Sequence, residues 1–253
     1  MLQVLICGIL GHMGQHMLAV CQNDPDTEVL GGIDQVDSVT SGIPVYSSFS
    51  SCDCSPDVVI DFSNPASTDA IIEYCRKTGT ALVMCTTGHT EDQQERLRAL
   101  ADDVPVFISA NMSIGIALLR SLAVKASLIL GERFDIEIVE RHHNRKLDAP
   151  SGTAKILADD INRAAEGKFE YAYDRHSVSK KRDKREIGIH SVRGGTIVGD
   201  HEVLFCGDDE LLSLSHQSTS RVVFAAGALK AAKFIRNLTS GLYNMDSIIE
   251  SMQ

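Results

Sequence analysis

A short apolar run, a glycine-rich turn and a helical pattern follow one another at the start of the chain. Leu2–Cys7 is apolar almost throughout, which is typical of a strand buried on both faces of a parallel sheet. Gly8, Gly11 and Gly14 come next, and His12–Cys21 carries apolar residues at the spacing of a helix with one buried face. The glycines therefore mark a strand-to-helix turn, which predicts the first half of a βαβ unit.

Such a turn is suited to the pyrophosphate of a dinucleotide, although the spacing is Gly-x-x-Gly-x-x-Gly and a merely tight turn would show it too. A second strand, Glu28–Ile33, ends in Asp34, which lies about 20 residues beyond Gly14, where the acid that binds the ribose hydroxyls is expected. Gln35 follows, and no Arg or Lys is adjacent in sequence to accept a 2′-phosphate. We therefore predict that NADH is the preferred cofactor, with NADPH as an alternative.

Strand and helix patterns alternate as far as residue 112, which predicts a Rossmann-like, doubly wound parallel sheet in an α/β protein. A long apolar helix, Ile116–Leu130, and strand-like segments without intervening helices follow. They predict an α+β domain with a mixed or antiparallel sheet, after which the Arg221–Ile235 helix returns to the first domain. We expect residues 1–112 and 221–253 to form the dinucleotide-binding domain and residues 113–220 to form a substrate-binding domain.

Charge and cysteine content exclude several classes of partner. The formal net charge of −10 argues against a nucleic-acid binder, so we expect the charged segment Lys168–Glu186 to be a mobile, solvated loop. The seven cysteines form no disulfide framework, and Cys52 and Cys54 lack the second pair that a zinc site requires. With no signal peptide or membrane span indicated, we expect a cytoplasmic protein with reduced thiols, no metal and no membrane contact.

The densest chemistry lies between Glu137 and Ala154. His142, His143 and Lys146 are followed by a Pro-Ser-Gly-Thr turn that leads into a helical pattern. Histidine titrates at about 6.5 when unperturbed and can exchange a proton near neutral pH. The N–H groups at the start of a helix bind anions such as carboxylates. A charged surface loop capped by Ser151 is the alternative interpretation, but the combination favours a site for a small anionic substrate.

This stretch resembles the signature of the dihydrodipicolinate reductase family, in the form Glu137-Ile-Val-Glu140-x-His142-x-x-x-Lys146-x-Asp148-x-Pro150-Ser-Gly-Thr-Ala154. Supporting motifs span most of the chain: Gly8 to Gly14, Asp61-Phe-Ser, Thr-Thr-Gly at 86–88, Ala110-Asn-x-Ser-x-Gly115, Arg193-Gly-Gly-x-Ile-Val-Gly-Asp-His201 and Ser220-Arg-x-x-Phe-Ala-x-Gly227. The resemblance implies hydride transfer from NADH or NADPH to a cyclic imine dicarboxylate in lysine and diaminopimelate biosynthesis, giving tetrahydrodipicolinate. It also implies a homotetramer built through the sheet of the second domain.

The resemblance further implies roles for individual residues. His142 matches the family's proton donor and Lys146 its partner, and which of the two delivers the proton stays open. His143, Gly152 and Thr153 match positions that hold the substrate carboxylates. The implied cofactor contacts are Gly8, Ile9, Leu10, Gly11, His12, Met13, Asp34, Cys85, Thr86, Thr87, Ser109, Ala110, Asn111 and Met112.

Three residues depart from the family pattern, namely Cys85, Met112 and Thr196. The thiol of Cys85 is expected to crowd the nicotinamide side of the pocket and to be open to oxidation. We expect the hinge between the domains in Asn111–Gly115.

Two other functions stay open at this point. A different Rossmann oxidoreductase, such as an aspartate or homoserine dehydrogenase, would need another substrate motif. An NAD-binding redox or nucleotide sensor would bind ligand without turnover. Whether the substrate ring is dehydrated or hydroxylated is also undecided, because both forms carry the same carboxylates.

Overall fold

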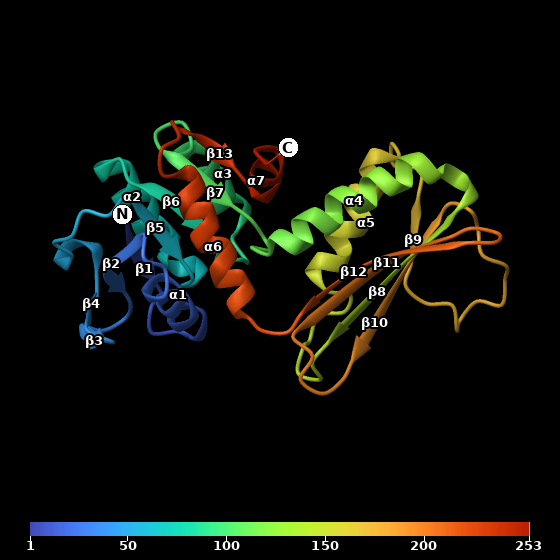
Figure 1. Cartoon of the computed structure of the whole chain (residues 1–253), viewed down its shortest axis with the longest axis horizontal. Helices are drawn as coiled ribbons and strands as arrows, with labels where there is room; N and C mark the ends of the chain where they lie inside the picture. The colour runs from blue at the N-terminus through green and yellow to red at the C-terminus, as the bar shows by residue number, and fades with distance from the viewer. Residues whose placement is uncertain (253) are drawn as a thin grey trace. The chain divides into compact units, whose positions relative to one another are not determined.

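The chain folds into two units, which a computed structural model describes for residues 1–252 (Figure 1). One unit combines Met1–Ile114 with the segment that begins at Arg221, and the other is Gly115–Ser220. We expected the first division after Met112, and the structure has it after Ile114. At each of the two boundaries the chain passes from one sheet to the other, because each unit contains one sheet of its own.

The first unit is built on an eight-stranded sheet with the order β13-β7-β6-β5-β1-β2-β4-β3. All paired strands are parallel except β3 and β4, so the predicted doubly wound sheet is confirmed. The strands are β1 (Leu2–Cys7), β2 (Thr27–Ile33), β3 (Ser38–Thr40), β4 (Ile43–Tyr46), β5 (Val58–Asp61), β6 (Ala81–Met84), β7 (Pro105–Ile108) and β13 (Gly241–Tyr243). The short edge strands β3 and β13 were not predicted, since three residues are too few to show a periodicity.

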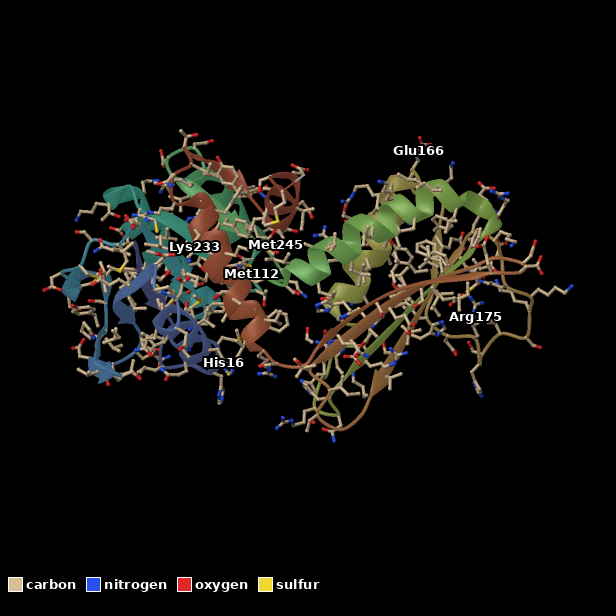
Figure 2. The ribbon with its side chains drawn as sticks, viewed as in Figure 1. His16, Met112, Glu166, Arg175, Lys233 and Met245 are labelled. Carbon is tan, nitrogen blue, oxygen red and sulfur yellow. The ribbon has the colours of Figure 1, made fainter. Side chains whose placement is uncertain are left out.

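Helices cover both faces of this sheet. They are α1 (His12–Gln22), α2 (Thr68–Thr78), α3 (Glu91–Leu100), α6 (Val222–Ile235) and α7 (Met245–Glu250). Apolar residues of α2 and α3 pack on one face, against Leu5, Val59 and Leu82. On the other face α6 runs beside α1, and Lys233 forms an ion pair with Asp24 (Figure 2). The segment that begins at Arg221 therefore completes the first unit.

The second unit has a five-stranded mixed sheet with the order β12-β11-β8-β10-β9. Its elements are α4 (Ile114–Leu130), β8 (Asp135–His142), α5 (Gly152–Ala164), β9 (Glu170–Ala172), β10 (Glu186–Arg193), β11 (Gly199–Cys206) and β12 (Leu211–Ser218). β10 is parallel to β8 and to β9, whereas β11 is antiparallel to β8 and β12. The predicted mixed sheet is confirmed.

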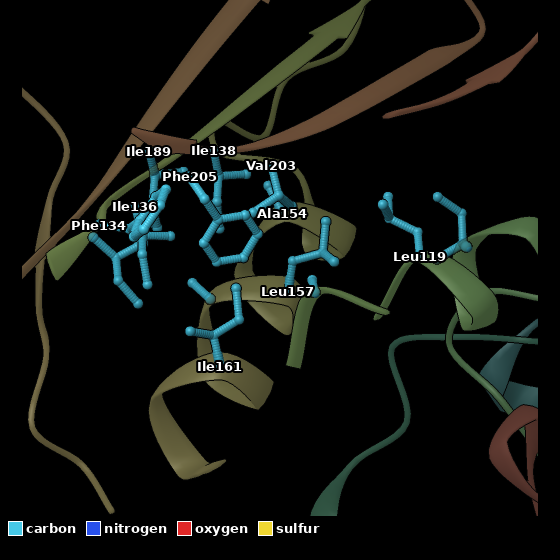
Figure 3. Packing of buried hydrophobic residues seen from close by; sticks show 14 residues of the cluster. Leu119, Phe134, Ile136, Ile138, Ala154, Leu157, Ile161, Ile189, Val203 and Phe205 are labelled. Carbon is cyan, nitrogen blue, oxygen red and sulfur yellow. The ribbon is translucent and has the colours of Figure 1, made fainter. Parts of the chain in front are cut away.

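The core of this unit lies between the sheet and its two long helices (Figure 3). Burial alternates along β8, so Ile136 and Ile138 face the core while the residues between them lie on the other face. Leu157 and Ile161 of α5 and Phe205 of β11 pack into the same cluster. Full burial of one such side chain stabilises the fold by roughly 1.5–3 kcal/mol.

Helix α4 contributes the other wall of the core through Ile116, Leu119 and Ala123. The segment Ile114–Arg133 is also long and apolar enough to cross a membrane, by length and composition alone. One side of the helix packs into the core, whereas the side chains of Leu118, Leu122, Leu128 and Ile129 are exposed.

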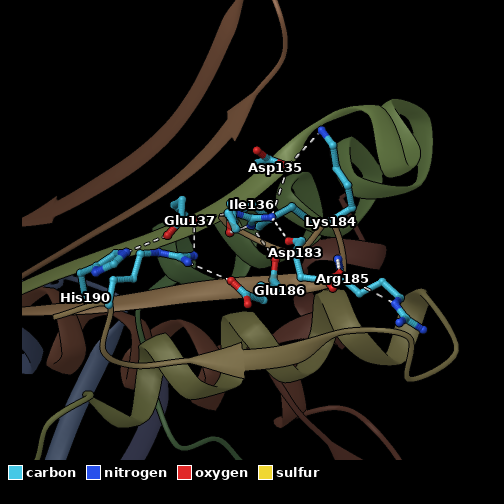
Figure 4. A network of polar contacts seen from close by, with 10 residues as sticks. Asp135, Ile136, Glu137, Asp183, Lys184, Arg185, Glu186 and His190 are labelled. Atoms are coloured by element: carbon cyan, nitrogen blue, oxygen red, sulfur yellow. Dashed lines mark hydrogen bonds and ion pairs between the residues drawn. The ribbon is translucent and has the colours of Figure 1, made fainter. Parts of the chain in front are cut away.

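The charged segment before β10 differs from the expected mobile loop. Residues 170–172 form β9, and Arg182 is only 17% exposed. Its guanidinium binds Glu137 at 2.8 Å and Asp135 at 3.2 Å (Figure 4). Arg175 adds ion pairs to Glu137 and Glu186. Residues 173–185 form a largely exposed loop as predicted, but the strand β9 and these ion pairs were missed because the acids that hold the segment lie on β8 and β10, far from it in sequence.

Candidate active site

The glycine turn joins β1 to α1 and leaves the start of the helix open. Gly8 has a φ of +73°, and a Cβ there would lie 2.6 Å from the carbonyl oxygen of Phe62. A Cβ at Gly14 would lie 2.0 Å from the carbonyl oxygen of Gly8. Gly11 occupies the N-cap position and supplies no side-chain acceptor. The first N–H groups of α1 are therefore not capped by a side chain, and this arrangement fits a phosphate group.

Asp34 follows β2 and reaches the glycine turn. Its Oδ2 accepts a hydrogen bond from the N–H of Leu10 at 2.9 Å, and its Oδ1 accepts one from Gln35 at 2.8 Å. An ionised carboxylate has about four acceptor positions, so Asp34 keeps capacity for ribose hydroxyls. The acid thus braces the turn in addition to the ligand role that its sequence position predicts.

Gly8, Gly11 and Asp34 line one cavity of about 720 Å³ within the first unit. Two aromatic residues that the sequence did not indicate also line it: Phe49 and Tyr74 are stacked with ring centroids 4.5 Å apart. Lys77 of α2 is a further lining residue. The cavity that Asp34 lines therefore contains a basic side chain, although none is adjacent to Asp34 in sequence.

The loops after β6 and β7 contain the other predicted cofactor contacts, at the carboxyl ends of the parallel strands where ligands bind in such sheets. Burial raises the pKa of the Cys85 thiol well above its ordinary value, as does the nearby Asp61. A raised pKa disfavours the reactive thiolate, whereas the side chain is only half-buried, so the oxidation of Cys85 stays a prediction. Burial likewise raises the pKa of Asp61.

The loop after β7 is held by its own side chains. The Ser109 hydroxyl donates to the carbonyl oxygen of Asn111 at 2.8 Å, and Oδ1 of Asn111 accepts from the N–H of Ser113 at 2.9 Å. Met112 is 3% exposed, so its side chain belongs to the core. Ile9 is likewise fully buried, so neither residue presents its side chain at the surface. Thr86, Thr87 and Ala110 lie in these two loops, and Leu10, His12 and Met13 lie in the glycine turn and at the start of α1.

In the second unit, β8 ends in His142, which is 8% exposed. His143 follows it, and the N–H of Lys146 donates to the carbonyl oxygen of His143 at 3.1 Å. Nζ of Lys146 lies 2.8 Å from Asp148, and this ion pair lowers the pKa of Asp148. The predicted proton-transfer residues therefore share one short turn.

Helix α5 begins where the carboxylate site was predicted. Ser151 is its N-cap, and the Ser151 hydroxyl accepts a hydrogen bond from the N–H of Ala154 at 3.2 Å. A Cβ added at Gly152 would meet no atom within 4 Å, so there is open space at the first turn, which also contains Thr153. The positive end of a helix with such space fits a carboxylate.

Four buried or half-buried residues around His142 were not predicted as part of the site: Glu140, Ser151, Arg193 and His201. The Ser151 hydroxyl lies 2.9 Å from Nε2 of His201. Burial, together with the nearby His142, lowers the pKa of His201 to about 4. Period-two alternation along β8 indicates that Glu140 and His142 share a face, whereas Arg193 and His201 come from strands whose register the sequence does not show.

The residues predicted to contact the cofactor belong to the first unit, and those predicted to transfer a proton or to hold the carboxylates belong to the second. Each set is assembled within its own unit. No group of three or more His, Cys, Asp or Glu side chains in residues 1–252 is placed to hold a metal ion.

Two family models together account for nearly the whole chain. The model described as dihydrodipicolinate reductase, N-terminus, matches residues 2–112, and the one described as dihydrodipicolinate reductase, C-terminus, matches residues 115–249. The chain belongs to the dihydrodipicolinate reductase family. It is an NAD(P)H-dependent oxidoreductase, and its first unit is the NAD(P)H-binding Rossmann domain. The resemblance inferred from Glu137–Ala154 is confirmed.

Individual relatives agree along their full length. A 4-hydroxy-tetrahydrodipicolinate reductase of Clostridium tetani is 43% identical over 251 residues, which are 99% of this chain and 98% of that protein. One of Caldanaerobacter subterraneus is 43% identical over 250 residues, 99% of each chain. A dipicolinate-bound dihydrodipicolinate reductase from Paenisporosarcina sp. has a TM-score of 0.80 at 27% identity, covering 96% of this chain and 97% of that one. A diaminopimelate dehydrogenase of Corynebacterium glutamicum, 12% identical with a TM-score of 0.57, shares the fold alone.

Proposed function

We infer that the chain is a 4-hydroxy-tetrahydrodipicolinate reductase of lysine and diaminopimelate biosynthesis, which reduces a cyclic imine dicarboxylate to tetrahydrodipicolinate. The observation that carries this assignment is the turn from His142 to Lys146, followed directly by the open start of α5 at Gly152. In this proposal the turn supplies the proton donors and the start of α5 supplies the anion site, and full-length identity of 43% to a reductase of this activity supports the reaction.

The glycine turn, Asp34 and the strand-end loops would hold the cofactor, which supplies a hydride when bound. We propose NADH as the preferred form, because the Asp34 carboxylate favours ribose hydroxyls and repels a 2′-phosphate. Lys77 in the same cavity is the one lining residue whose charge would oppose that preference.

The substrate would be held by its carboxylates. The N–H groups of Gly152 and Thr153 at the positive end of α5 provide one anion site, and His143 lies in the neighbouring turn. A solved relative is described as dipicolinate-bound, and dipicolinate is a planar ring with two carboxylates. Fixing both carboxylates orients the ring, so binding is converted into alignment of the reacting carbon.

Reduction of an imine leaves a basic nitrogen, and a positioned acid that delivers a proton typically accelerates such a step by about 10²- to 10⁴-fold. We assign this role to His142 with Lys146 as its partner. His142 lies at the end of a sheet strand, which is a rigid position, whereas Lys146 is oriented by Asp148 at 2.8 Å. We further propose Asn111–Gly115 as the hinge, because the division between the units falls after Ile114.

We also propose a cytoplasmic homotetramer. One face of the second sheet is covered by α4 and α5, while the face that carries Val139 and Arg141 has no helix over it in this unit. An uncovered sheet face with Val192 44% exposed suits association with further copies. Light scattering that gives four times the mass of one chain supports this, and a monomeric mass contradicts it. All seven cysteines are free, as in a reducing compartment.

The activity is tested by following NADH absorbance with the full chain and substrate generated from pyruvate and aspartate semialdehyde. Rapid, protein-dependent loss of NADH is the expected result. NADH binding by calorimetry without turnover would instead identify a sensor, and turnover with aspartate or homoserine alone would identify a different dehydrogenase.

A further inference from the structure

A buried carboxylate lies directly behind the proposed proton donor. Glu140 is 0% exposed, and its Oε2 is 2.5 Å from Nδ1 of His142. The two residues are two apart on β8, so their side chains lie on the same face of the sheet. Nothing in the assigned roles of His142 and Lys146 uses Glu140.

Both oxygens of Glu140 are held from other elements. Arg193 of β10, which pairs with His142 in the sheet, donates to Oε1 at 2.7 Å and to Oε2 at 2.8 Å. The N–H of Ser151 at the start of α5 donates to Oε1 at 3.1 Å. Burial alone would raise the pKa of Glu140, but the hydrogen bonds from Arg193, Ser191 and His142 lower it to about 2. Glu140 is therefore a fixed anion.

The fixed negative charge of Glu140 beside Nδ1 determines which ring nitrogen of His142 carries the proton. In histidine, the hydrogen bond made by one ring nitrogen sets the state of the other. A carboxylate accepts only, so Nδ1 must donate to Glu140. Nε2 has no hydrogen-bond partner in residues 1–252 and faces Gly199, where a Cβ would lie only 3.1 Å away. Any side chain at Gly199 would therefore crowd Nε2.

We propose that Glu140 is the positioning residue of the reductase: it holds the proton of His142 Nδ1, orients the ring and leaves Nε2 as the nitrogen that delivers the proton to the substrate. The same carboxylate binds Ser151, the residue before Gly152, so it also fixes the proton donor relative to the carboxylate site. This inference rests on the proposed role of His142. Arg193 is part of the arrangement because it keeps Glu140 ionised.

The direct test is ¹⁵N NMR of the full chain labelled at histidine, with the His142 signals identified by their loss in His142→Gln. We expect Nδ1 of His142 to carry a proton at every pH at which the chain is folded, including where Nε2 does not. An unprotonated Nδ1 at any such pH overturns the proposal. This readout needs no turnover, so it is independent of whether the assigned reaction is correct.

The kinetic test uses Glu140→Gln, which keeps the shape of the side chain and removes its charge. We expect kcat to fall about 10- to 100-fold while KM for the dicarboxylate changes less than about threefold. The matched control is Asp160→Asn, which removes a carboxylate that pairs with Arg120 at 2.6 Å in the same unit. Its kcat should stay within about twofold of wild type.

Glu140 lies in the second unit, so an unchanged far-UV circular dichroism spectrum and an unchanged midpoint of urea unfolding show that the Glu140→Gln chain is folded. Wild-type kcat in that folded variant contradicts the proposal. If the variant does not fold, the NMR measurement on the wild-type chain decides, because it requires no substitution of Glu140.

Discussion

The carboxylate of Asp34 accepts a hydrogen bond from the backbone N–H of Leu10 at 2.9 Å, so the acid after β2 is tied to the glycine turn before α1. A residue expected only to bind ribose therefore also holds the glycine turn in place. Substitution of Asp34 consequently affects two parts of the cofactor site, and a test of cofactor preference has to separate them.

Asp34→Ala and Gln35→Arg should both raise the ratio of kcat/KM for NADPH to that for NADH, because each change reduces the repulsion of a 2′-phosphate. Only Asp34→Ala should also lower kcat/KM for NADH, by about tenfold, since it removes the bond to Leu10 as well. Lys77→Ala should lower kcat/KM for NADPH and leave kcat/KM for NADH unchanged. A several-fold preference of the wild-type enzyme for NADPH would contradict this account.

Gly227 of α6 lies against the backbone of Met112, where a Cβ would come within 1.7 Å of the carbonyl oxygen. Gly227→Ala must push the helix away from the loop that contains Ser109–Met112. We expect a loss of roughly 1–3 kcal/mol in the free energy of unfolding and weaker NADH binding, measured by urea titration and calorimetry.

The control for this effect is Gly194→Ala, because a Cβ at Gly194 would meet no atom within 4 Å. Its free energy of unfolding should change by no more than about 0.5 kcal/mol. Equal stability of the two variants would show that the contact between α6 and Met112 does not constrain the first unit.

His201 should make stability depend on pH. Its pKa is about 4 in the folded chain against an ordinary 6.5, so the unfolded chain binds more protons between these values and stability falls as pH falls through this window. Between about pH 7.5 and about pH 5 the loss due to His201 is about 2 kcal/mol. His201→Gln should remove that part of the pH dependence of the free energy of unfolding, measured by urea titration at several pH values. The same pH dependence of the free energy of unfolding in wild type and His201→Gln would contradict this prediction.

The strand and helix alternation, the glycine turn and the family signature were readable from the sequence because they depend on local periodicity and on residues adjacent in the chain. Residues contributed by distant segments were not readable. Arg193 reaches Glu140 only because β10 pairs with β8 in a register that places it opposite His142. Phe49, in the short 3-10 helix Phe49–Ser51, stacks on Tyr74 of α2. Arg182 forms its ion pairs with acidic residues of β8.

Lys146→Ala should lower kcat and raise KM for the substrate together, since the ammonium group is proposed both to assist protonation and to attract the dicarboxylate. About a tenfold effect on each is expected. Lys168→Ala is the matched control, because Lys168 is exposed beyond the end of α5 and should leave both constants within about twofold. A change in KM alone would remove Lys146 from proton transfer.

The steady-state constants of His142→Gln, with NADH and enzymatically generated substrate, test the central claim most directly. A protonated imidazole that acts only on the reacting ring contributes to turnover and little to binding. We predict that kcat falls by about 100-fold or more while KM for the substrate stays within about threefold. Wild-type kcat in a folded His142→Gln enzyme would contradict the account.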